Sequence, residues 1–299
     1  MIPRGVILMT EQFPGAALQD VVQTIEALGY DSIWLPELFG REPFATAGYL
    51  LAGTQRIAIA TGIANVYARD ACATAQARHC LAELSGGRFM LGLGVSNAGA
   101  NGRRGHAWVP PLTKLTTYLE AMAAVEVGAP PPAQPAPLHL AAHGPKLQAL
   151  SVRHGAGVIT YLMPPAHTRI SRARIDAGTA LSVVAPFIAE QDPTIARAKA
   201  RAALAVYMSL DYYHREWRKL GFGAADFDGG GSDRLIDTLV AWGDMAALHE
   251  HVAEYERAGA TRVIVLPLAL QTRAGLDIRV LEQLAPAAAR GMPTAAPEV

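Results

Sequence analysis

The sequence predicts an α/β protein, and specifically a (β/α)₈ TIM barrel with an insertion late in the chain. Eight short apolar runs alternate with longer amphipathic segments. The chain has 299 residues, which divided by eight gives about 37 per strand–helix unit, as a barrel of about 250 residues or more requires. Short continuous apolar runs are typical of parallel strands covered on both faces. A doubly wound open sheet is the alternative that the same alternation allows.

The first half of the chain supplies four strands and four helices. Each run rich in Val, Ile, Leu or Phe predicts a strand, and the segment after it carries apolar residues at helical spacing. Gly29 and the pair Gly86-Gly87 mark two helix ends, because glycine adopts the left-handed C-terminal cap readily. In order we expect strand 5–9, helix 16–28, strand 32–35, helix 44–52, strand 57–61, helix 71–84, strand 89–93 and helix 112–127.

The second half repeats the pattern with one interruption. The proline-rich stretch 128–137 predicts a stiff loop. After it we expect strand 138–141, helix 146–153, strand 157–161, helix 167–177, strand 181–188, helix 245–258, strand 263–267 and helix 277–289. The interruption at about 192–240 predicts a long helix 193–210, an aromatic stretch 212–217 and a glycine-rich tip 228–233. Residues 1–290 are therefore expected to form a single barrel domain, and 291–299 a flexible tail.

The composition excludes several classes of protein. Lys plus Arg and Asp plus Glu are 26 each, so the formal net charge is zero, which argues against a nucleic-acid binder because that function needs a basic face. No apolar run reaches the length of a membrane span. The two cysteines, Cys72 and Cys80, lie eight apart in a predicted helix, about 12 Å at 1.5 Å per residue, too far for a disulfide. We expect both to be buried helix residues, and the protein to be cytoplasmic.

The residues that follow the predicted strands contain few ionisable groups. The active site of a barrel lies at the C-terminal ends of its strands. There we find no Ser–His–Asp arrangement, no cluster of carboxylates and no set of metal ligands, and the helical pair His249 and His251 faces two directions. An apolar mouth with few polar groups suits a large flat cofactor better than hydrolysis.

Two turns and one aromatic segment are candidate binding elements. The first turn opens a helix and consists of His143-Gly144-Pro145-Lys146. The free N–H groups at a helix start suit a phosphate, and Thr160, one strand away, could donate a hydroxyl to it. An ordinary strand-to-helix turn is the alternative. The second turn, Gly92-Leu93-Gly94, lacks the spacing of a dinucleotide fingerprint and precedes a long polar loop. Its glycines either let a flat ring approach the backbone or serve a structural turn. The aromatic residues at 212–217 form either a substrate lid or a packing face.

Four segments together resemble a known family. They are 29–42, 60–97, 138–146 and 155–162, of which the continuous block 60–97 is the most specific. They resemble the luciferase-like monooxygenase superfamily of flavin-dependent oxidoreductases, and within it the branch that uses coenzyme F420, a deazaflavin. The resemblance covers most of residues 1–190 and resumes around 240–285. It implies a (β/α)₈ barrel whose mouth holds the tricyclic ring, backed by a bulge with a cis peptide at Gly62–Ile63.

The resemblance also implies where the cofactor binds. The ring would lie against the bulge and the end of the fourth strand, and the phosphate against the turn after the fifth strand and the end of the sixth. The expected cofactor-binding residues are Thr61, Gly62, Ile63, Ala64, Asn65, Gly94, Ser96, Asn97, Ala142, His143, Gly144, Pro145, Thr160 and Tyr161.

The sequence departs from the family at two positions. Many F420-dependent enzymes of this superfamily carry an Asp-His pair after the second strand, where this chain has Glu37 and Leu38. A glutamate found after the fourth strand in some members corresponds to about Asn97. A sugar-phosphate dehydrogenase is therefore not expected. Glu37 and His143 are the candidate catalytic residues for proton transfer, with a structural carboxylate as the alternative role of Glu37.

The expected function is hydride transfer between F420 and a small organic substrate at the barrel mouth. An FMN-dependent monooxygenase and a non-catalytic flavin-binding barrel are the alternatives. The sequence does not predict the identity of the substrate. By analogy with relatives, a homodimer is the expected assembly.

Overall fold

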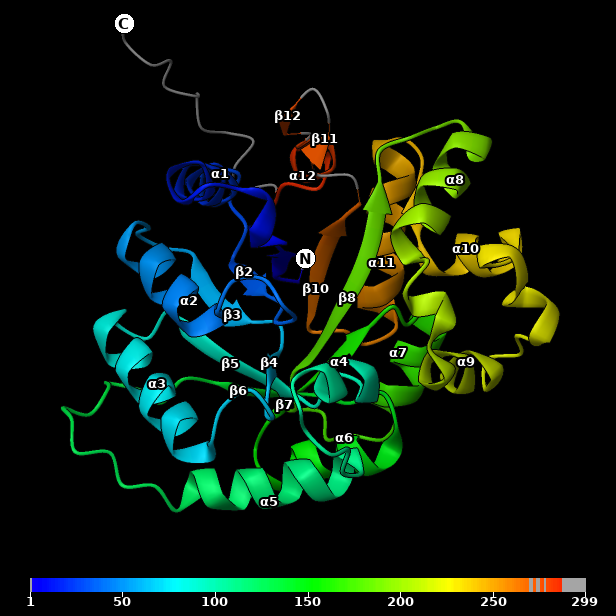
Figure 1. Ribbon diagram of the computed structural model, residues 1–299. Coiled ribbons are helices and arrows are strands. Elements are labelled where there is room, and N and C mark those ends of the chain that lie inside the picture. Colours follow the sequence, from blue (N-terminus) through cyan, green and yellow to red (C-terminus); the bar gives the residue numbers. More distant parts are fainter. Residues whose placement is uncertain (1, 269–270, 273–274, 277, 287–299) are drawn as a thin grey trace, which may run out of the picture.

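The computed structural model describes residues 2–268, 271–272, 275–276 and 278–286. Eight parallel strands form a closed barrel, and Figure 1 shows how the elements are arranged. Each strand pairs with the next along the chain, and the last pairs with the first, which closes the barrel and excludes an open sheet. The (β/α)₈ prediction is therefore confirmed. The strands are β1 (Arg4–Ile7), β2 (Ser32–Leu35), β3 (Ala58–Thr61), β5 (Phe89–Gly94), β6 (Leu138–Ala141), β7 (Gly157–Tyr161), β8 (Leu181–Ile188) and β10 (Arg262–Pro267).

The main helices cover the outside of the barrel. Each buries one face: α1 buries Leu18, Val21, Val22 and Ile25, the spacing of a single helical stripe. Side-chain caps set several helix starts; the carboxylate of Asp70, for example, accepts a hydrogen bond from the backbone N–H of Ala73. These helices are α1 (Gly15–Ala27), α2 (Pro43–Ala52), α3 (Ala71–Leu84), α5 (Pro111–Ala123), α6 (Pro145–Arg153), α7 (Pro165–Arg172), α11 (Met245–Arg257) and α12 (Arg279–Gln283).

The inside of the barrel is a second, separate core. Buried side chains from alternate positions of the strands fill it, namely Ile7, Trp34, Ala60, Met90, Ile159, Val184, Ile264 and Leu266. Trp34 is fully buried and contacts the ring of His139 edge-on at 5.3 Å. Because this core is packed, a ligand can bind only at an end of the barrel.

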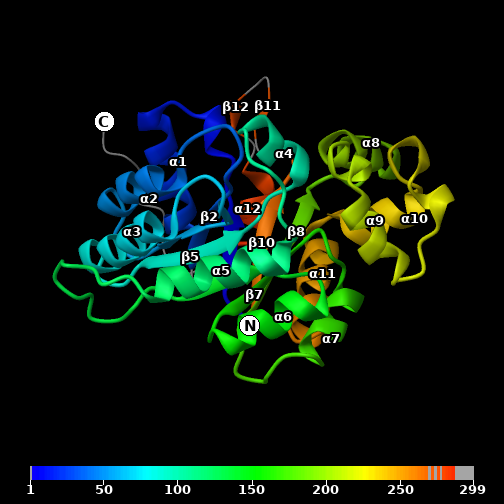
Figure 2. The same ribbon diagram turned by 60° about the horizontal axis from the view of Figure 1, so that its bottom comes forward.

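Residues 192–240 form a helical subassembly on one side of the barrel. It contains α8 (Pro193–Leu204), α9 (Asp211–Arg218) and α10 (Asp233–Leu239), with short 3₁₀ turns at Tyr207–Ser209, Ala224–Asp226 and Asp228–Gly230. Figure 2 shows these helices beside β8. Their apolar cluster includes Leu162, Met163 and Ile188 of the barrel, so the insertion packs directly on the ends of β7 and β8.

Several expectations differ from the structure. The polar stretch after β5 contains a helix, α4 (Ala98–Arg103), which Asn97 caps by accepting a hydrogen bond from the N–H of Ala100. The helix expected at 193–210 ends at Leu204, and the one expected at 112–127 ends at Ala123. Two further strand pieces, β4 (Ala64–Asn65) and β9 (Ala241–Trp242), extend the sheet, and β11 (Gln271–Thr272) pairs with β12 (Gly275–Leu276).

The expectation that the cysteines are buried is wrong. Cys72 and Cys80 are both exposed and free. Helix α3 packs through Thr74, Leu81 and Ala82, and at 100° per residue both cysteines lie away from that face. The expected tail 291–299 and the end of the expected last helix, 287–289, lie outside the described residues. Within the described residues, no helix is long and apolar enough to cross a membrane.

Candidate active site at the barrel mouth

A cavity of about 640 Å³ opens at the C-terminal ends of β3, β5, β6 and β7 and is closed on one side by α9. It contains half of the residues expected to bind a cofactor: Gly62, Ile63, Ser96, Asn97, His143, Gly144 and Tyr161 line it. The others are not among its lining residues, namely Thr61, Ala64, Asn65, Gly94, Ala142, Pro145 and Thr160. Within the described chain, no group of His, Cys, Asp and Glu side chains is arranged to hold a metal ion.

The bulge after β3 forms one end of the cavity. The peptide Gly62–Ile63 is cis, as the family resemblance implies. Gly62 lies against Trp34, since a Cβ on Gly62 would approach the Trp34 Cβ to 2.8 Å. A Cβ on Gly94 would lie 2.6 Å from Cδ1 of Ile63, so Gly94 makes room for the Ile63 side chain. The second glycine of the Gly92-Leu93-Gly94 motif therefore allows the Ile63 side chain of the bulge to pack against the end of β5.

The first glycine of that motif serves the junction between two strands. A Cβ on Gly92 would lie 2.2 Å from the carbonyl oxygen of Thr61. The hydroxyl of Thr61 donates to the Gly92 carbonyl at 2.7 Å and accepts from the Gly92 N–H at 2.9 Å. Thr61 thus fixes β3 on β5 below the cavity instead of lining it.

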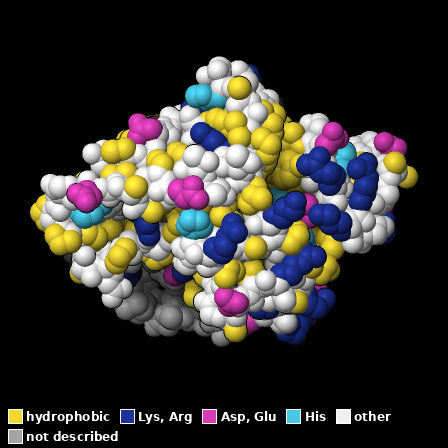
Figure 3. All heavy atoms as spheres, turned by 90° about the horizontal axis from the view of Figure 1, so that it is seen from below, with side chains coloured by type: hydrophobic (Ala, Val, Ile, Leu, Met, Phe, Trp, Pro, Cys, Tyr) yellow, Lys and Arg dark blue, Asp and Glu magenta, His cyan; other side chains and the backbone are white. Residues whose placement is uncertain are grey.

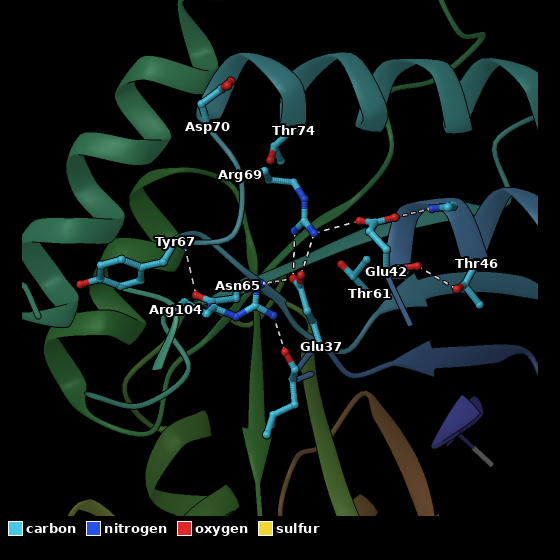
Figure 4. A network of polar contacts seen from close by, with 12 residues as sticks. Glu37, Glu42, Thr46, Thr61, Asn65, Tyr67, Arg69, Asp70, Thr74 and Arg104 are labelled. Atoms are coloured by element: carbon cyan, nitrogen blue, oxygen red, sulfur yellow. Dashed lines mark hydrogen bonds and ion pairs between the residues drawn. The ribbon is translucent and has the colours of Figure 1, made fainter. Parts of the chain in front are cut away.

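Glu37 belongs to a buried polar network behind the bulge (Figure 4). It is 8% exposed, and its Oε2 accepts from the backbone N–H of Asn65 at 2.7 Å. Both terminal nitrogens of Arg69 donate to the same carboxylate, at 2.9 and 2.7 Å, and Arg69 also pairs with Glu42 at 2.8 Å. Burial alone would lower the pKa of Arg69, but the bonds to Glu37 and Glu42 outweigh it and raise that pKa.

The network continues from Asn65 to α4. The Asn65 side chain donates to Oδ1 of Asn101 at 2.8 Å, and the Asn101 side chain donates to the carbonyl of Val95 at 2.7 Å. The backbone around the bulge is thus tied to β2, α2 and α4. Glu37 does not line the cavity, so a catalytic role for it stays a prediction, and the structure places it as a support for the bulge.

The turn after β6 forms the opposite end of the cavity. Gly144 is the N-terminal cap of α6 and Pro145 its first residue, and no side chain caps this helix start. The carbonyl of His143 accepts hydrogen bonds from the Gln148 amide at 3.2 Å and is 3.0 Å from Nε2 of His167. The turn therefore has a fixed shape, and the backbone N–H groups of Lys146 and Leu147 have no partner among the described residues, as an anion site requires.

His143 is held as a neutral ring. Its Nε2 accepts the backbone N–H of Tyr161 at 3.1 Å, which places its own hydrogen on Nδ1. Burial first, and then the nearby His167 and Lys219, lower the pKa of His143 to about 3. The ring stacks on Tyr212 at 5.9 Å. His143 thus lines the cavity as an uncharged group, and its catalytic role stays a prediction.

Thr160 faces away from the cavity. Its neighbours on β7, Ile159 and Tyr161, both line the cavity, and successive side chains of a strand point to opposite faces. Thr160 is 1% exposed, and its hydroxyl has no hydrogen-bond partner within the described residues. The hydroxyl expected beside the phosphate therefore lies on the helix side of β7.

The aromatic stretch of the insertion both packs on the barrel and lines the cavity. Tyr213 and Trp217, one helical turn apart on α9, are buried, and Nε1 of Trp217 donates to the Leu162 carbonyl at 3.1 Å. Tyr212 and Arg215 line the cavity, and Tyr213 also borders it. One face of α9 therefore packs on the barrel while the next covers the mouth.

A smaller cavity of about 250 Å³ lies at the same end of the barrel, next to the ends of β1 and β10. Tyr161 lines both cavities. Its hydroxyl lies 2.9 Å from the hydroxyl of Tyr207, which lines only the smaller one. No motif in the sequence indicated this pair, because the two tyrosines are 46 residues apart.

The family of the chain follows from a match to a family model. The model described as luciferase-like monooxygenase matches residues 2–262. The chain belongs to the luciferase-like monooxygenase family. The match covers the barrel strands up to the start of β10 and includes the whole insertion.

Two proteins with sequences similar to this chain are named as reductases. A 5,10-methylenetetrahydromethanopterin reductase of Archaeoglobus fulgidus is 24% identical over 292 residues, which cover 83% of this chain and 88% of the relative. One of Methanolobus tindarius is 30% identical over 173 residues; that match spans 51% of this chain and about half, 52%, of the relative.

Solved structures share the fold of this luciferase-like chain. A coenzyme F420-dependent tetrahydromethanopterin reductase from Methanopyrus kandleri has a TM-score of 0.74 at 17% identity and covers 95% of this chain and 97% of its own. The oxygenating constituent of 3,6-diketocamphane monooxygenase from Pseudomonas putida, in complex with FMN, has a TM-score of 0.68 at 14% identity. The match covers 97% of this chain and 98% of that chain. At these identities the likeness shows the fold.

Proposed function

We propose that this luciferase-like protein is a coenzyme F420-dependent oxidoreductase that transfers a hydride between the deazaflavin and a small organic substrate. The observation that carries the proposal is the cavity of about 640 Å³, which joins the Gly62–Ile63 bulge to the uncapped start of α6 at Gly144. One end is apolar and the other accepts an anion, which matches a flat ring with a phosphate-bearing side chain. The relatives and solved structures reported above are named as reductases and a monooxygenase, so a non-catalytic barrel comes last among the alternatives.

The lining residues fit such a cofactor. Ile63, Val95, Ile159 and Val184 supply apolar contacts for a ring. At the other end, added atoms at Gly144 would meet nothing within 4 Å, so a ligand has room to approach the backbone. Arg215 lines this cavity and makes no ion pair within the described residues, which leaves it available to an anionic group.

The residues of the chain have distinct tasks in this proposal. When bound, the deazaflavin supplies a two-electron hydride carrier. The Glu37–Arg69 pair holds the bulge, and His143, neutral near pH 7, holds the backbone of Tyr161. Tyr212 and the rest of α9 limit the access of water to the mouth. The chain thereby orients ring and substrate.

FMN is the alternative cofactor, and its use would make the protein a monooxygenase. The FMN-bound structure named above shares the fold, and the same cavity would accommodate a three-ring system with a phosphate. A putative coenzyme F420-dependent oxidoreductase of Mycobacterium tuberculosis, 23% identical over 309 residues (82% of this chain and 89% of the relative), supports F420, and we therefore place F420 first.

Titration of the purified apoprotein with F420 and, separately, with FMN tests the proposal. We expect the fluorescence of F420 to report a dissociation constant in the micromolar range or below, and FMN to bind at least ten-fold more weakly. The reverse order would move the protein to the FMN monooxygenases. Binding of neither cofactor would overturn the assignment of the large cavity.

A further inference from the structure

The smaller cavity has a chemical character different from that of the large one. Its walls are apolar: Ile7 at the end of β1 and Met9 two residues later, Leu266–Leu268 at the end of β10, and Ala203 and Leu204 from α8. Its polar lining residues are Gln12, Tyr161 and Tyr207. None of the described side chains that line it is charged, whereas Asp211, Arg215 and Glu216 line the large cavity.

Tyr161 and Tyr207 form a hydrogen-bonded pair beside the boundary between the two cavities. Tyr161 lines both, and its hydroxyl pairs with that of Tyr207 at 2.9 Å. Burial raises the pKa of each phenol, so both keep their protons at neutral pH. Two phenols carry two O–H protons, and their mutual bond uses one of them. The pair therefore offers one further donor and free oxygen lone pairs to a bound molecule.

The size of the smaller cavity limits its occupant. About 250 Å³ equals the liquid volume of about eight water molecules, at about 30 Å³ each. A phosphate or carboxylate in this cavity would lose its hydration without meeting a cation among the described lining side chains, which makes its binding unfavourable. A compact apolar molecule with one uncharged oxygen function loses little hydration and finds a hydrogen-bond partner in the tyrosine pair.

We propose that the smaller cavity is the substrate site and that it selects a compact, neutral molecule bearing one carbonyl or hydroxyl group, which the Tyr161–Tyr207 pair binds. The proposal rests on the proposed function, because the cavity is a substrate site only if the large cavity holds the redox cofactor. Tyr161 borders both ligands and sets where the oxygen function lies relative to the cofactor. Tyr207, through Tyr161, is a positioning residue for the same oxygen.

The test uses two probes with the same ring and different charge. Cyclohexanone and cyclohexanecarboxylate are titrated into the protein loaded with F420, and binding is followed by saturation-transfer difference NMR, which requires no turnover. We expect cyclohexanone to bind and the carboxylate to bind at least ten-fold more weakly. A stronger response from the carboxylate would overturn the proposal.

Three variants locate the binding. Tyr207→Phe removes the hydroxyl that only the smaller cavity contacts, and we expect it to weaken cyclohexanone about 5- to 10-fold while leaving the F420 dissociation constant unchanged. Tyr49→Phe is the matched control, because Tyr49 is exposed on α2 and lines neither cavity; it should leave cyclohexanone binding unchanged. Ala203→Trp, at an exposed position of α8, should block the small cavity and abolish the NMR signal.

The outcomes separate this inference from the proposed function. If F420 binds and cyclohexanone is unaffected by Tyr207→Phe and Ala203→Trp, the inference is wrong and the proposed function stands. If F420 does not bind, the proposed function fails, and the inference fails with it as a statement about a substrate. Circular dichroism melting curves of each variant confirm that a lost signal does not come from unfolding.

Discussion

The two sides of the barrel mouth are held in different ways. On the side of β2, β3 and β5, the bulge depends on a buried ion pair, Glu37 with Arg69, and on backbone hydrogen bonds. On the side of the insertion, Tyr212 and Tyr213 reach the mouth through ring contacts with His143 at 5.9 and 5.7 Å. The comparison indicates a fixed platform for a ring on one side and, on the other, a cover held mainly by ring contacts together with the hydrogen bond from Trp217 to Leu162.

Removing the cation of the platform side has the largest expected effect. Arg69→Ala leaves the Glu37 carboxylate buried without its partner, and we expect the free energy of unfolding to fall by about 3 kcal/mol, measured by urea denaturation. F420 affinity should fall as well, because the bulge loses its support. The double variant Glu37→Gln/Arg69→Met should recover part of the stability; equal losses in the single and double variants would contradict the ion-pair explanation.

Acid should destabilise the barrel through its buried histidines. Burial, and then Arg262, lower the pKa of His139 to about 4, from an ordinary value of 6.5. The folded state therefore resists protonation, so its stability is complete above pH 6.5 and is lost as pH falls toward 4. We expect a loss of about 2 kcal/mol from His139 between pH 6.5 and 5.

The variant His139→Phe isolates that contribution. It keeps an aromatic ring beside Trp34 and has no titratable group. Urea denaturation at several pH values should show a shallower loss of stability for this variant than for the wild type. Parallel pH profiles would show that His139 does not titrate as described.

Adding a side chain at Gly94 tests whether cofactor binding depends on the position of the Ile63 side chain in the bulge. Gly94→Ala places a methyl group 2.6 Å from Cδ1 of Ile63, and we expect a loss of about 2 kcal/mol and weaker F420 binding. Gly102→Ala, at an exposed position of α4 with nothing within 4 Å, is the matched control and should neither lower stability nor weaken F420 binding. Normal F420 binding by Gly94→Ala would mean that the position of Ile63 does not matter for the cofactor.

The smallest expected effect concerns the charges on the cover side. Figure 3 shows Lys and Arg side chains gathered on one part of the face seen from below. Lys146, in the first turn of α6, is exposed, and so is Arg215 of α9. We expect Lys146→Ala and Arg215→Ala each to weaken F420 about 3-fold at 0.05 M salt, and less at 0.5 M, because salt screens exposed charges.

Arg153→Ala is the control for Lys146→Ala, since Arg153 is exposed at the other end of the same helix. It should leave the fluorescence titration with F420 unchanged. Equal weakening by Arg153→Ala would indicate a general effect of net charge in place of an anion site at the start of α6.

Much of the fold was predictable because the relevant signals are local. All eight barrel strands lie within a few residues of their expected positions, and helix 71–84 agrees with α3 at both ends. The helices that end early show the limit: α8 stops at Leu204 although apolar residues continue to Leu210. There the apolar side chains pack in the insertion cluster, and periodicity alone does not reveal which partner they meet.

The sequence by itself determined the barrel, its late insertion and the turns that surround the mouth, because apolar periodicity, glycines and prolines act over a few neighbouring residues. Only the tertiary structure decided the role of each residue in those turns. Glu37 meets Arg69, 32 residues away, and Thr160 faces the helices while Tyr161 faces both cavities. Such roles depend on which strand ends meet and which face of each strand points inward, and these are properties of the closed barrel as a whole.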